Sequence, residues 1–491
     1  MGEHSSILVV VISLIASITN VFIALVRKSL CYPFFVFILG ICFLLSMDIL
    51  YTVINFGTVK YKLGGWMPPW GIEYVVDHLN AFVIAIVATI SFVVAIYAKE
   101  SIKKEIAKPR LPYFYSTYLL LVAGLIGIVI TGDIFNLFVF LEIASLAGYA
   151  LIAIGEKRSV LASFNYIIMG TIGACFYLLG VGYIYIITGS LNIADLTRLL
   201  PPLYESKVTL AALAFFVIGV AIKIALFPLH RWLPDSYTFA PSAVSAFASA
   251  TVTKVGIYVL IRISYTLFEP RFLTEITPLS TILVWWATIA IFFGSTIALG
   301  QIDFKRTLSY ILVAEVGYIV LGVSLGNKEG FIGAVLHILN DAVMIACLFM
   351  IAGGLFYRIG RRNLTDFTGL KKYMPITMTA FLVTSLSMIG VPPTAGFFSK
   401  WYLILGAIRA EQWISASALI FSSLVNAIIF FKLLEKVYFS KKEAIPKYNF
   451  RELPLSMLTP IVLMGLAVLV LGIYSGKIIS TVIEFTVPKG F

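Results

Sequence analysis

Four charged side chains stand inside long apolar stretches of this 491-residue chain: Glu142, Lys223, Lys254 and Lys400. An ionisable group near the middle of a bilayer costs about 2.5–3.5 kcal/mol on insertion scales, and such residues often mark pathways for ions or protons. Burial disfavours a charged lysine, and a neighbouring carboxylate favours it again. A glutamate such as Glu142, placed beside a lysine such as Lys223, would therefore act as a charge switch.

Two further acids and a histidine extend this set. His337 and Asp341 lie four residues apart, on one face of a predicted helix, and Glu315 lies inside the preceding apolar stretch. Histidine titrates near neutrality, and a carboxylate can hold or return its proton. The alternative for His337 and Asp341 is a hydrogen-bonded polar pair that joins two helices. The predicted proton or ion pathway consists of Glu142, Lys223, Lys254, Glu315, His337, Asp341 and Lys400.

Structural explanations compete with this interpretation. Glu142 lies eight residues beyond Ile134, roughly 12 Å into its apolar run, which is too deep for so short a side chain to reach water. An incidental polar contact is the alternative there. Lys223 lies five residues before Pro228, so its alternative is a lysine at a helix end that reaches towards the membrane surface. Lys254 and Lys400 lie farther from such ends.

The elements that must position these residues are membrane-spanning helices. The chain is 60% hydrophobic, above the roughly 50% of soluble domains, and apolar runs long enough to cross a bilayer recur along it. We count fourteen such runs, with little room for a soluble domain. They cover residues 5–26, 31–54, 78–98, 113–131, 134–154, 161–187, 208–228, 241–268, 278–300, 307–326, 330–357, 375–408, 413–434 and 455–475.

Loop charges predict the orientation. The loops after odd-numbered runs carry most of the lysines and arginines, at residues 27–28, 99–110, 157–158, 305–306, 358–372 and 436–451. The positive-inside rule then places these loops in the cytoplasm and both termini outside a cell membrane. The formal net charge of +12 follows from this arrangement, and no nucleic-acid-binding motif accompanies it.

Prolines interrupt two of the runs. Pro228 interrupts the seventh run, and Pro392 with Pro393 interrupts the twelfth. A proline removes a backbone donor and frees the carbonyl one turn earlier, here Ile224 and Met388. Free backbone at membrane depth survives only inside protein or beside water.

Paired broken helices in the two halves of a transporter indicate inverted repeats around a central site. We therefore predict an all-α polytopic membrane protein with two inverted five-helix repeats. Its segments are three N-terminal helices in 1–110, helices four to eight in 111–268, helices nine to thirteen in 269–440, and a last helix in 441–491.

Other chemistry finds no support. The four cysteines are scattered without a C-x-x-C pair, and the sequence has no P-loop, no G-x-G-x-x-G and no haem-attachment motif. We expect no catalytic residue, metal site or cofactor in this chain, so any driving redox chemistry would belong to a partner.

Several segments together resemble one known family. These are G-G-W-M-P-P-W-G-I followed by Asp77, G-D-I-F-N-L-F-V-F-L-E, K-I-A-L-F-P-L-H-R-W-L-P-D-S, K-V-G-I-Y, Q-I-D-F-K-R-T-L-S-Y and G-V-P-P-T-A-G-F-F-S-K-W. They are similar to the antiporter-like subunits of respiratory complex I, to the D subunit of Mrp-type cation/proton antiporters, and to subunits of archaeal membrane-bound hydrogenases and sulfur-reducing complexes. The resemblance covers nearly the whole chain.

The resemblance implies a fourteen-helix core and site roles for individual residues. Glu142 would match the family's essential glutamate, Lys223 the lysine of the first broken helix, Lys254 the basic residue of the eighth helix, and Lys400 the terminal lysine. His337 would match the first histidine of the eleventh helix. Two departures stand out, because Ile345 replaces a lysine and Glu315 replaces a common glutamine.

The function predicted on this basis is proton translocation as one membrane subunit of a larger, redox-driven complex. The partners would be other membrane subunits, the lipid bilayer, and protons with or without Na⁺. One alternative is the D subunit of an Mrp-type Na⁺/H⁺ antiporter. Another is a structural spacer that does not conduct, to which Ile345 lends support.

Overall fold

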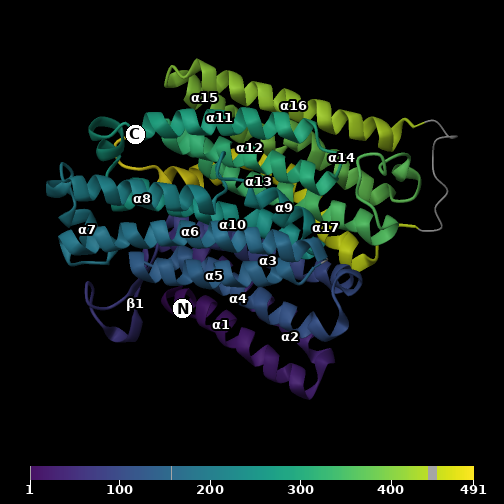
Figure 1. Ribbon diagram of the computed structural model, residues 1–491, viewed down its shortest axis with the longest axis horizontal. Coiled ribbons are helices and arrows are strands. Elements are labelled where there is room, and N and C mark those ends of the chain that lie inside the picture. The colour runs from purple at the N-terminus through teal and green to yellow at the C-terminus, as the bar shows by residue number, and fades with distance from the viewer. Residues whose placement is uncertain (1, 156, 441–450) are drawn as a thin grey trace.

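The computed structural model describes residues 2–155, 157–440 and 451–491, and nearly all of its regular structure is helical. In the described part of the chain, twelve helices are long and apolar enough to cross a membrane. Figure 1 shows most of the long helices side by side, with their axes nearly parallel. Those twelve are α1 (Gly2–Val26), α2 (Cys31–Phe56), α3 (His78–Glu105), α4 (Leu111–Ile130), α5 (Ile134–Ala153), α6 (Lys157–Thr188), α10 (Ser242–Arg262), α11 (Leu279–Leu299), α12 (Phe304–Ser324), α13 (Lys328–Ile359), α16 (Trp413–Tyr438) and α17 (Leu455–Ile473).

Shorter helices occupy the two interrupted runs and some connections. They are α7 (Ile193–Leu199), α8 (Lys207–Lys223), α9 (Trp232–Phe239), α14 (Pro375–Ile389), α15 (Ala395–Arg409) and α18 (Ser475–Ile478). The seventh run thus divides into α8 and α9, and the twelfth into α14 and α15, with irregular backbone between the parts. The total of fourteen crossings and the repeat boundaries stay predictions.

One end of the bundle carries a short β-hairpin, which the sequence patterns did not predict. Its strands are β1 (Val59–Lys62) and β2 (Glu73–Val76), which pair antiparallel. The rings of His4 and Tyr61 lie 5.9 Å apart, so the N-terminal end of α1 is near this hairpin. His78 and Phe485 stack at 4.9 Å, which brings the C-terminal region to the same end, here called the hairpin end (Figure 1).

The central helix is α13, which packs against α3, α10, α12, α14, α15 and α17. Its first turn is capped by the Asn327 side chain, which accepts a hydrogen bond from the backbone amide of Gly330. It ends at Gly360, whose φ of 72° is a left-handed conformation that suits glycine. The helix is apolar on nearly all sides, which agrees with its position inside the bundle.

Close backbone contacts hold the interrupted segments. A Cβ added to Gly219 of α8 would lie 2.7 Å from the carbonyl oxygen of Gly173 on α6. A Cβ added to Gly396 at the start of α15 would lie 2.0 Å from the carbonyl oxygen of Ser387 on α14. Both positions therefore require a residue without a side chain, as is common where membrane helices approach closely.

One loop charge is placed differently from the expectation. Lys305 is fully buried in the first turn of α12, a helix that Asp303 caps. Its ammonium donates hydrogen bonds to the carbonyl of Ala240 and to the hydroxyl of Ser245. Of the other predicted cytoplasmic charges, Lys441, Lys442 and Lys447 lie outside the described residues, as does the start of the predicted 441–491 segment.

Candidate functional site

The first charged pair joins α5 to the end of α8. The Nζ atom of Lys223 lies 3.5 Å from a carboxylate oxygen of Glu142. It also donates a hydrogen bond of 2.7 Å to the hydroxyl of Ser145, one turn farther along α5. Lys223 can reach both groups because α8 ends at this residue, before the irregular segment around Pro228. The Glu142 side chain is 30% exposed, so this pair stays closer to the bundle surface than the others.

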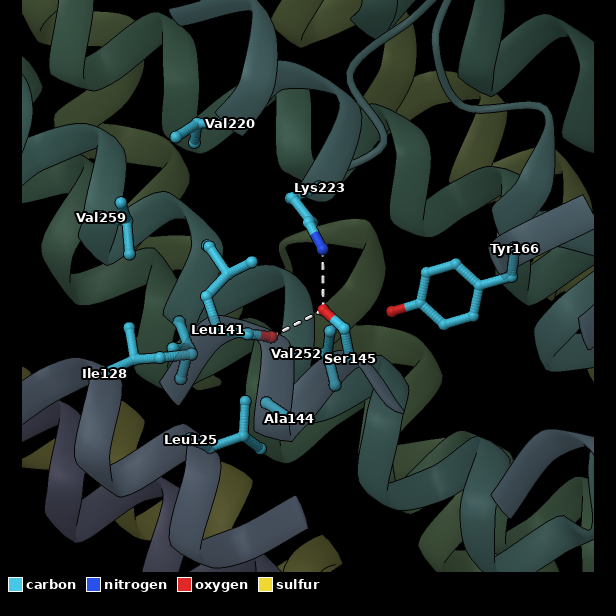
Figure 2. A pocket seen from close by; sticks show the side chains of 12 residues that line it. Leu125, Ile128, Leu141, Ala144, Ser145, Tyr166, Val220, Lys223, Val252 and Val259 are labelled. Atoms are coloured by element: carbon cyan, nitrogen blue, oxygen red, sulfur yellow. Dashed lines mark hydrogen bonds between the residues drawn. The ribbon is translucent and has the colours of Figure 1, made fainter. Parts of the chain in front are cut away.

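A small cavity lies beside Lys223. It has a volume of about 40 Å³ and is bordered by side chains of α4, α5, α6, α8 and α10. Figure 2 shows Lys223 and the hydroxyl of Tyr166 both directed towards Ser145 at its edge. A water molecule needs only about 10–15 Å³ of such volume, so the cavity has room for a few. Because Val252 and Gly256 of α10 also line it, the cavity extends from Lys223 towards the helix that carries Lys254.

The second charged pair lies in the centre of the bundle. The Nζ atom of Lys254 on α10 is 2.5 Å from a carboxylate oxygen of Asp341 on α13. It also donates a hydrogen bond of 2.9 Å to the backbone carbonyl of Ser249. Lys254 is 1% exposed and Asp341 is fully buried, so the surrounding protein must compensate both charges.

The third group contains Glu315, His337 and Lys400. One carboxylate oxygen of Glu315 lies 2.6 Å from Nε2 of His337, and the other lies 4.0 Å from Nζ of Lys400. The second ring nitrogen of His337 is hydrogen-bonded to the hydroxyl of Ser399 at 2.9 Å. The amide of Asn426 on α16 donates to Glu315 at 3.4 Å. All five side chains are buried between α12, α13, α15 and α16.

The second helix break contributes directly to this group. Lys400 donates a hydrogen bond of 2.6 Å to the carbonyl of Met388, the carbonyl that Pro392 was expected to free. Asn426 donates to the same carbonyl at 3.4 Å. At the first break, Trp232 donates to the carbonyl of Ile222 at 2.9 Å. That Pro228 frees the carbonyl of Ile224 stays a prediction.

His337 and Asp341 have different partners, although they lie one turn apart on α13. His337 faces Glu315 of α12, whereas Asp341 faces Lys254 of α10. Helices α10 and α12 both pack on α13, and a difference of four residues is enough to direct each side chain to a separate neighbour. His337 and Asp341 therefore belong to two different charged groups and do not form one pair. Ile345, one turn farther, is fully buried and apolar.

Three contributors had not been identified from sequence. Ser145 accepts a hydrogen bond from Lys223, and Asn426 donates one to Glu315. Lys305 is buried near the start of α10. Isolated serine and asparagine residues in apolar helices carry no sequence signal that separates a functional contact from ordinary polar contacts between helices. Lys305 stands next to Arg306 and therefore looks like a loop charge.

Taken together, the seven predicted residues form three groups across six helices. The order through the bundle is Glu142–Lys223, Lys254–Asp341, and His337–Glu315–Lys400. Each group places at least one base beside at least one carboxylate, so each can bind and release protons by changing how its members are paired.

Comparisons with known proteins place the chain among related sequences. Residues 131–426 match the family described as NADH:quinone oxidoreductase/Mrp antiporter, TM. The chain is 45% identical to NADH-quinone oxidoreductase subunit N of Desulforudis audaxviator, over 99% of both proteins. It is 34% identical to the D subunit of the Na(+)/H(+) antiporter of Alkalihalophilus pseudofirmus, over 82% of this chain and 80% of that protein.

The fold is also similar to that of a chain in the membrane-bound sulfane sulfur reductase, an archaeal respiratory membrane complex. The TM-score is 0.91 with 31% sequence identity, and the similarity covers 98% of this chain and 97% of that chain.

Proposed function

This chain belongs to the NADH:quinone oxidoreductase/Mrp antiporter transmembrane family, and we propose that it translocates protons as one membrane subunit of a redox-driven complex. It is a multi-pass membrane protein, homologous to antiporter-like subunits of multisubunit ion-pumping complexes. The observation that carries the proposal is the row of three charged groups, of which the second and third are buried and the first is partly buried. An uncompensated buried charge is costly, whereas a chain of paired groups can pass charge by exchanging partners.

The first step of the proposed pathway is a switch between Glu142 and Lys223. At 3.5 Å the carboxylate favours the protonated lysine, and the hydroxyl of Ser145 offers the ammonium a second partner. A change in the charge or position of Glu142 would lower the affinity of Lys223 for its proton. The adjoining cavity has room for a few waters and reaches Val252 and Gly256 of α10, so it would supply the route by which that proton moves towards Lys254.

The second step passes the proton through the centre. Lys254 and Asp341 form the middle group, and His337, Glu315 and Lys400 form the last. In the family resemblance a lysine occupies the position of Ile345. Here the acids Asp341 and Glu315 take over the role of that missing base, each paired with a cation at hydrogen-bonding or ion-pair distance.

The positions of the acid–lysine pairs support two structural repeats. Glu142 lies on the second run of the proposed 111–268 segment and Lys223 on its fourth, at the helix break. Glu315 and Lys400 occupy the corresponding second and fourth runs of the 269–440 segment, and Lys400 again lies beside a break. The separations are similar, at 3.5 Å and 4.0 Å. These two segments are therefore the proposed repeats, flanked by 1–110 and 441–491.

The D subunit of a Na⁺/H⁺ antiporter is the second candidate, because one such protein is 34% identical to this chain. The redox-driven candidate is supported by higher identity, 45%, to an NADH-quinone oxidoreductase subunit. A spacer that does not conduct has less support. Buried ion pairs can often be replaced by apolar side chains without loss of stability, so a spacer gains nothing by keeping three charged groups.

Changing Glu142 to Gln tests the proposed switch. The amide keeps the shape but removes the charge that favours protonated Lys223, so proton transport should fall at least about tenfold, which corresponds to about 1.4 kcal/mol in the barrier. The measurement is proton uptake by sealed vesicles that contain equal amounts of assembled complex. The matched control is Glu275→Gln, at a carboxylate that is 64% exposed.

Near-normal transport by Glu142→Gln would remove the switch from the mechanism. The same vesicles also separate the two candidate functions. Wild-type transport should continue in buffer without Na⁺, whereas a strict requirement for Na⁺ would favour the antiporter candidate.

The proposed orientation places both termini and the hairpin outside, and residues 99–110 with 358–372 in the cytoplasm. Lys104 donates to the carbonyl of Tyr357, so these two basic segments lie at the same end of the bundle. In a background without the native cysteines, Lys104→Cys and Lys62→Cys should react with a membrane-impermeant thiol reagent from opposite sides. Lys104→Cys should react only from the cytoplasmic side. Reaction of both from one side would contradict the fourteen-helix arrangement.

A further inference from the structure

A cavity with both polar and apolar residues in its wall lies at the hairpin end of α10, away from the three charged groups. Its volume is about 100 Å³, which is room for several water molecules. The polar residues around it lie at or just beyond the ends of α3, α4 and α10, and they are Asp77, Asn80, Thr131, Tyr258, Arg262 and Thr266. Val75, Gly132, Ile193 and Ala194 complete the lining. Two larger cavities, of about 290 and 390 Å³, are lined almost entirely by apolar side chains. A buried water needs two to four polar partners, which the smaller cavity offers, whereas an apolar cavity stays dry.

Arg262 organises one wall of this cavity. Its guanidinium donates hydrogen bonds to Asp77 at 2.5 Å, to the hydroxyl of Tyr258 at 3.0 Å and to the hydroxyl of Thr266 at 3.2 Å. It also donates to the side-chain carbonyl of Asn80. Arg262 is largely enclosed, while Asp77 is about one-third exposed, so Asp77 forms the outer side of the group.

Asp77 keeps its charge at this position. Burial acts to raise the pKa of its carboxyl, but the neighbouring charge of Arg262 and hydrogen bonds from Arg262 and from the amides of Leu79 and Asn80 outweigh it. The pKa of Asp77 is therefore lowered from its ordinary value. The ion pair with Arg262 consequently persists at neutral pH, at the outer side of the cavity.

Tyr258, which lines the cavity, lies one turn from Lys254 on α10. Lys254, Tyr258 and Arg262 follow at intervals of four residues, so they share one face of α10, about 6 Å apart along its axis. Tyr258 is buried, donates to the carbonyl of Val129 at 2.8 Å, and accepts from Asn80 at 2.8 Å and from Arg262. The ammonium of Lys254 is directed the opposite way, to the carbonyl of Ser249. The structure is therefore closed between Lys254 and the cavity.

We propose that this cavity is a water-filled vestibule through which Lys254 exchanges protons with the solvent at the hairpin end. The Asp77–Arg262 pair forms its outer gate and Tyr258 its inner gate. In the transfer, the Lys254 ammonium turns away from Ser249 and replaces Asn80 as a donor to the Tyr258 oxygen, while the Tyr258 hydroxyl turns from the carbonyl of Val129 to a water in the vestibule. One proton passes from the ammonium to the phenol oxygen as the hydroxyl proton passes to that water. The amine is left neutral, the phenol is regenerated, and the proton leaves past Asp77.

This inference rests on the proposed transport through Lys254, and its test separates the two. Tyr258→Phe keeps the ring and its packing but removes the hydroxyl that relays the proton. Proton uptake by vesicles with equal amounts of assembled complex should fall at least about tenfold. The matched control is Tyr97→Phe, at a fully buried tyrosine that also donates one hydrogen bond to a backbone carbonyl. That control should transport normally.

A second measurement probes access to the vestibule. Thr266→Cys, in a background without native cysteines, should react with a membrane-impermeant cationic thiol reagent added at the hairpin end, and the reaction should block transport. Thr274→Cys, which is exposed at the same end, should react without loss of transport, and Thr251→Cys, which is fully buried on α10, should not react.

Two outcomes would overturn the vestibule. They are normal transport by Tyr258→Phe, and normal transport after complete modification of Thr266→Cys. If Lys254→Met abolishes transport in the same assay, the proposed function stands even when the vestibule fails. If Lys254→Met transports normally, the proposed function itself fails.

Discussion

Proton transport is expected to fall at least about a hundredfold when Asp341 is changed to Asn. The carboxylate lies 2.5 Å from the ammonium of Lys254, and neither side chain has appreciable access to solvent. Removing one partner of a buried ion pair typically costs about 3–5 kcal/mol, because the remaining charge is uncompensated. Lys254 must then lose its proton or move, and in either case the central group no longer cycles between two charge states. The measurement is proton uptake by sealed vesicles.

A double variant separates this effect from simple destabilisation. Lys254→Met with Asp341→Leu replaces both charges by apolar side chains, a change that buried pairs often tolerate. The double variant should therefore assemble at least as well as Asp341→Asn, yet transport no protons. Transport near the wild-type rate by either variant would show that the central pair is outside the pathway.

The second large effect is expected for Glu315→Gln. This carboxylate is shared between His337 at 2.6 Å and Lys400 at 4.0 Å, and the side chain is fully buried. Glutamine can accept a hydrogen bond but cannot balance a cation, so two basic groups would lose one counter-charge. Transport should fall as far as it does for Lys400→Ala, by at least about a hundredfold, or about 2.7 kcal/mol in the barrier.

The control for this change is Glu484→Gln, which alters an exposed pair with Lys328 and should leave transport unchanged. The family resemblance suggests that a glutamine is common at the position of Glu315. Full activity of Glu315→Gln would therefore mean that a neutral side chain suffices here and that the acid is not a proton carrier in this chain.

Much of the helical arrangement was predictable from the sequence. Long apolar runs predicted where the membrane helices lie, and the prolines predicted irregular backbone after Lys223 and before Lys400. The burial of Lys254 agrees with its distance from the ends of its apolar run. These features depend on local composition, hydrophobic length and the missing amide of proline, all of which are readable from a single chain.

The pairing of side chains between helices was less predictable. His337 and Asp341 share a helical face, yet they contact different helices, because the partner depends on how α10 and α12 are rotated around α13. The burial of Lys305 depends on the position of the segment around Ala240, which is distant in sequence. No periodicity within one helix contains this information. The short hairpin was missed because its four-residue strands are brief and only partly alternating.

The carbonyl of Met388 has a consequence for the speed of the last transfer. A backbone carbonyl is a fixed dipole that does not titrate, so Lys400 keeps this partner whether Glu315 is charged or neutral. Lys223 instead donates to the hydroxyl of Ser145, which can rotate and exchange roles as donor or acceptor. Lys400 should therefore change charge with little reorganisation of its surroundings, whereas the site of Lys223 must rearrange. The slow step would then lie at the Glu142 end of the pathway, where an external trigger could control it.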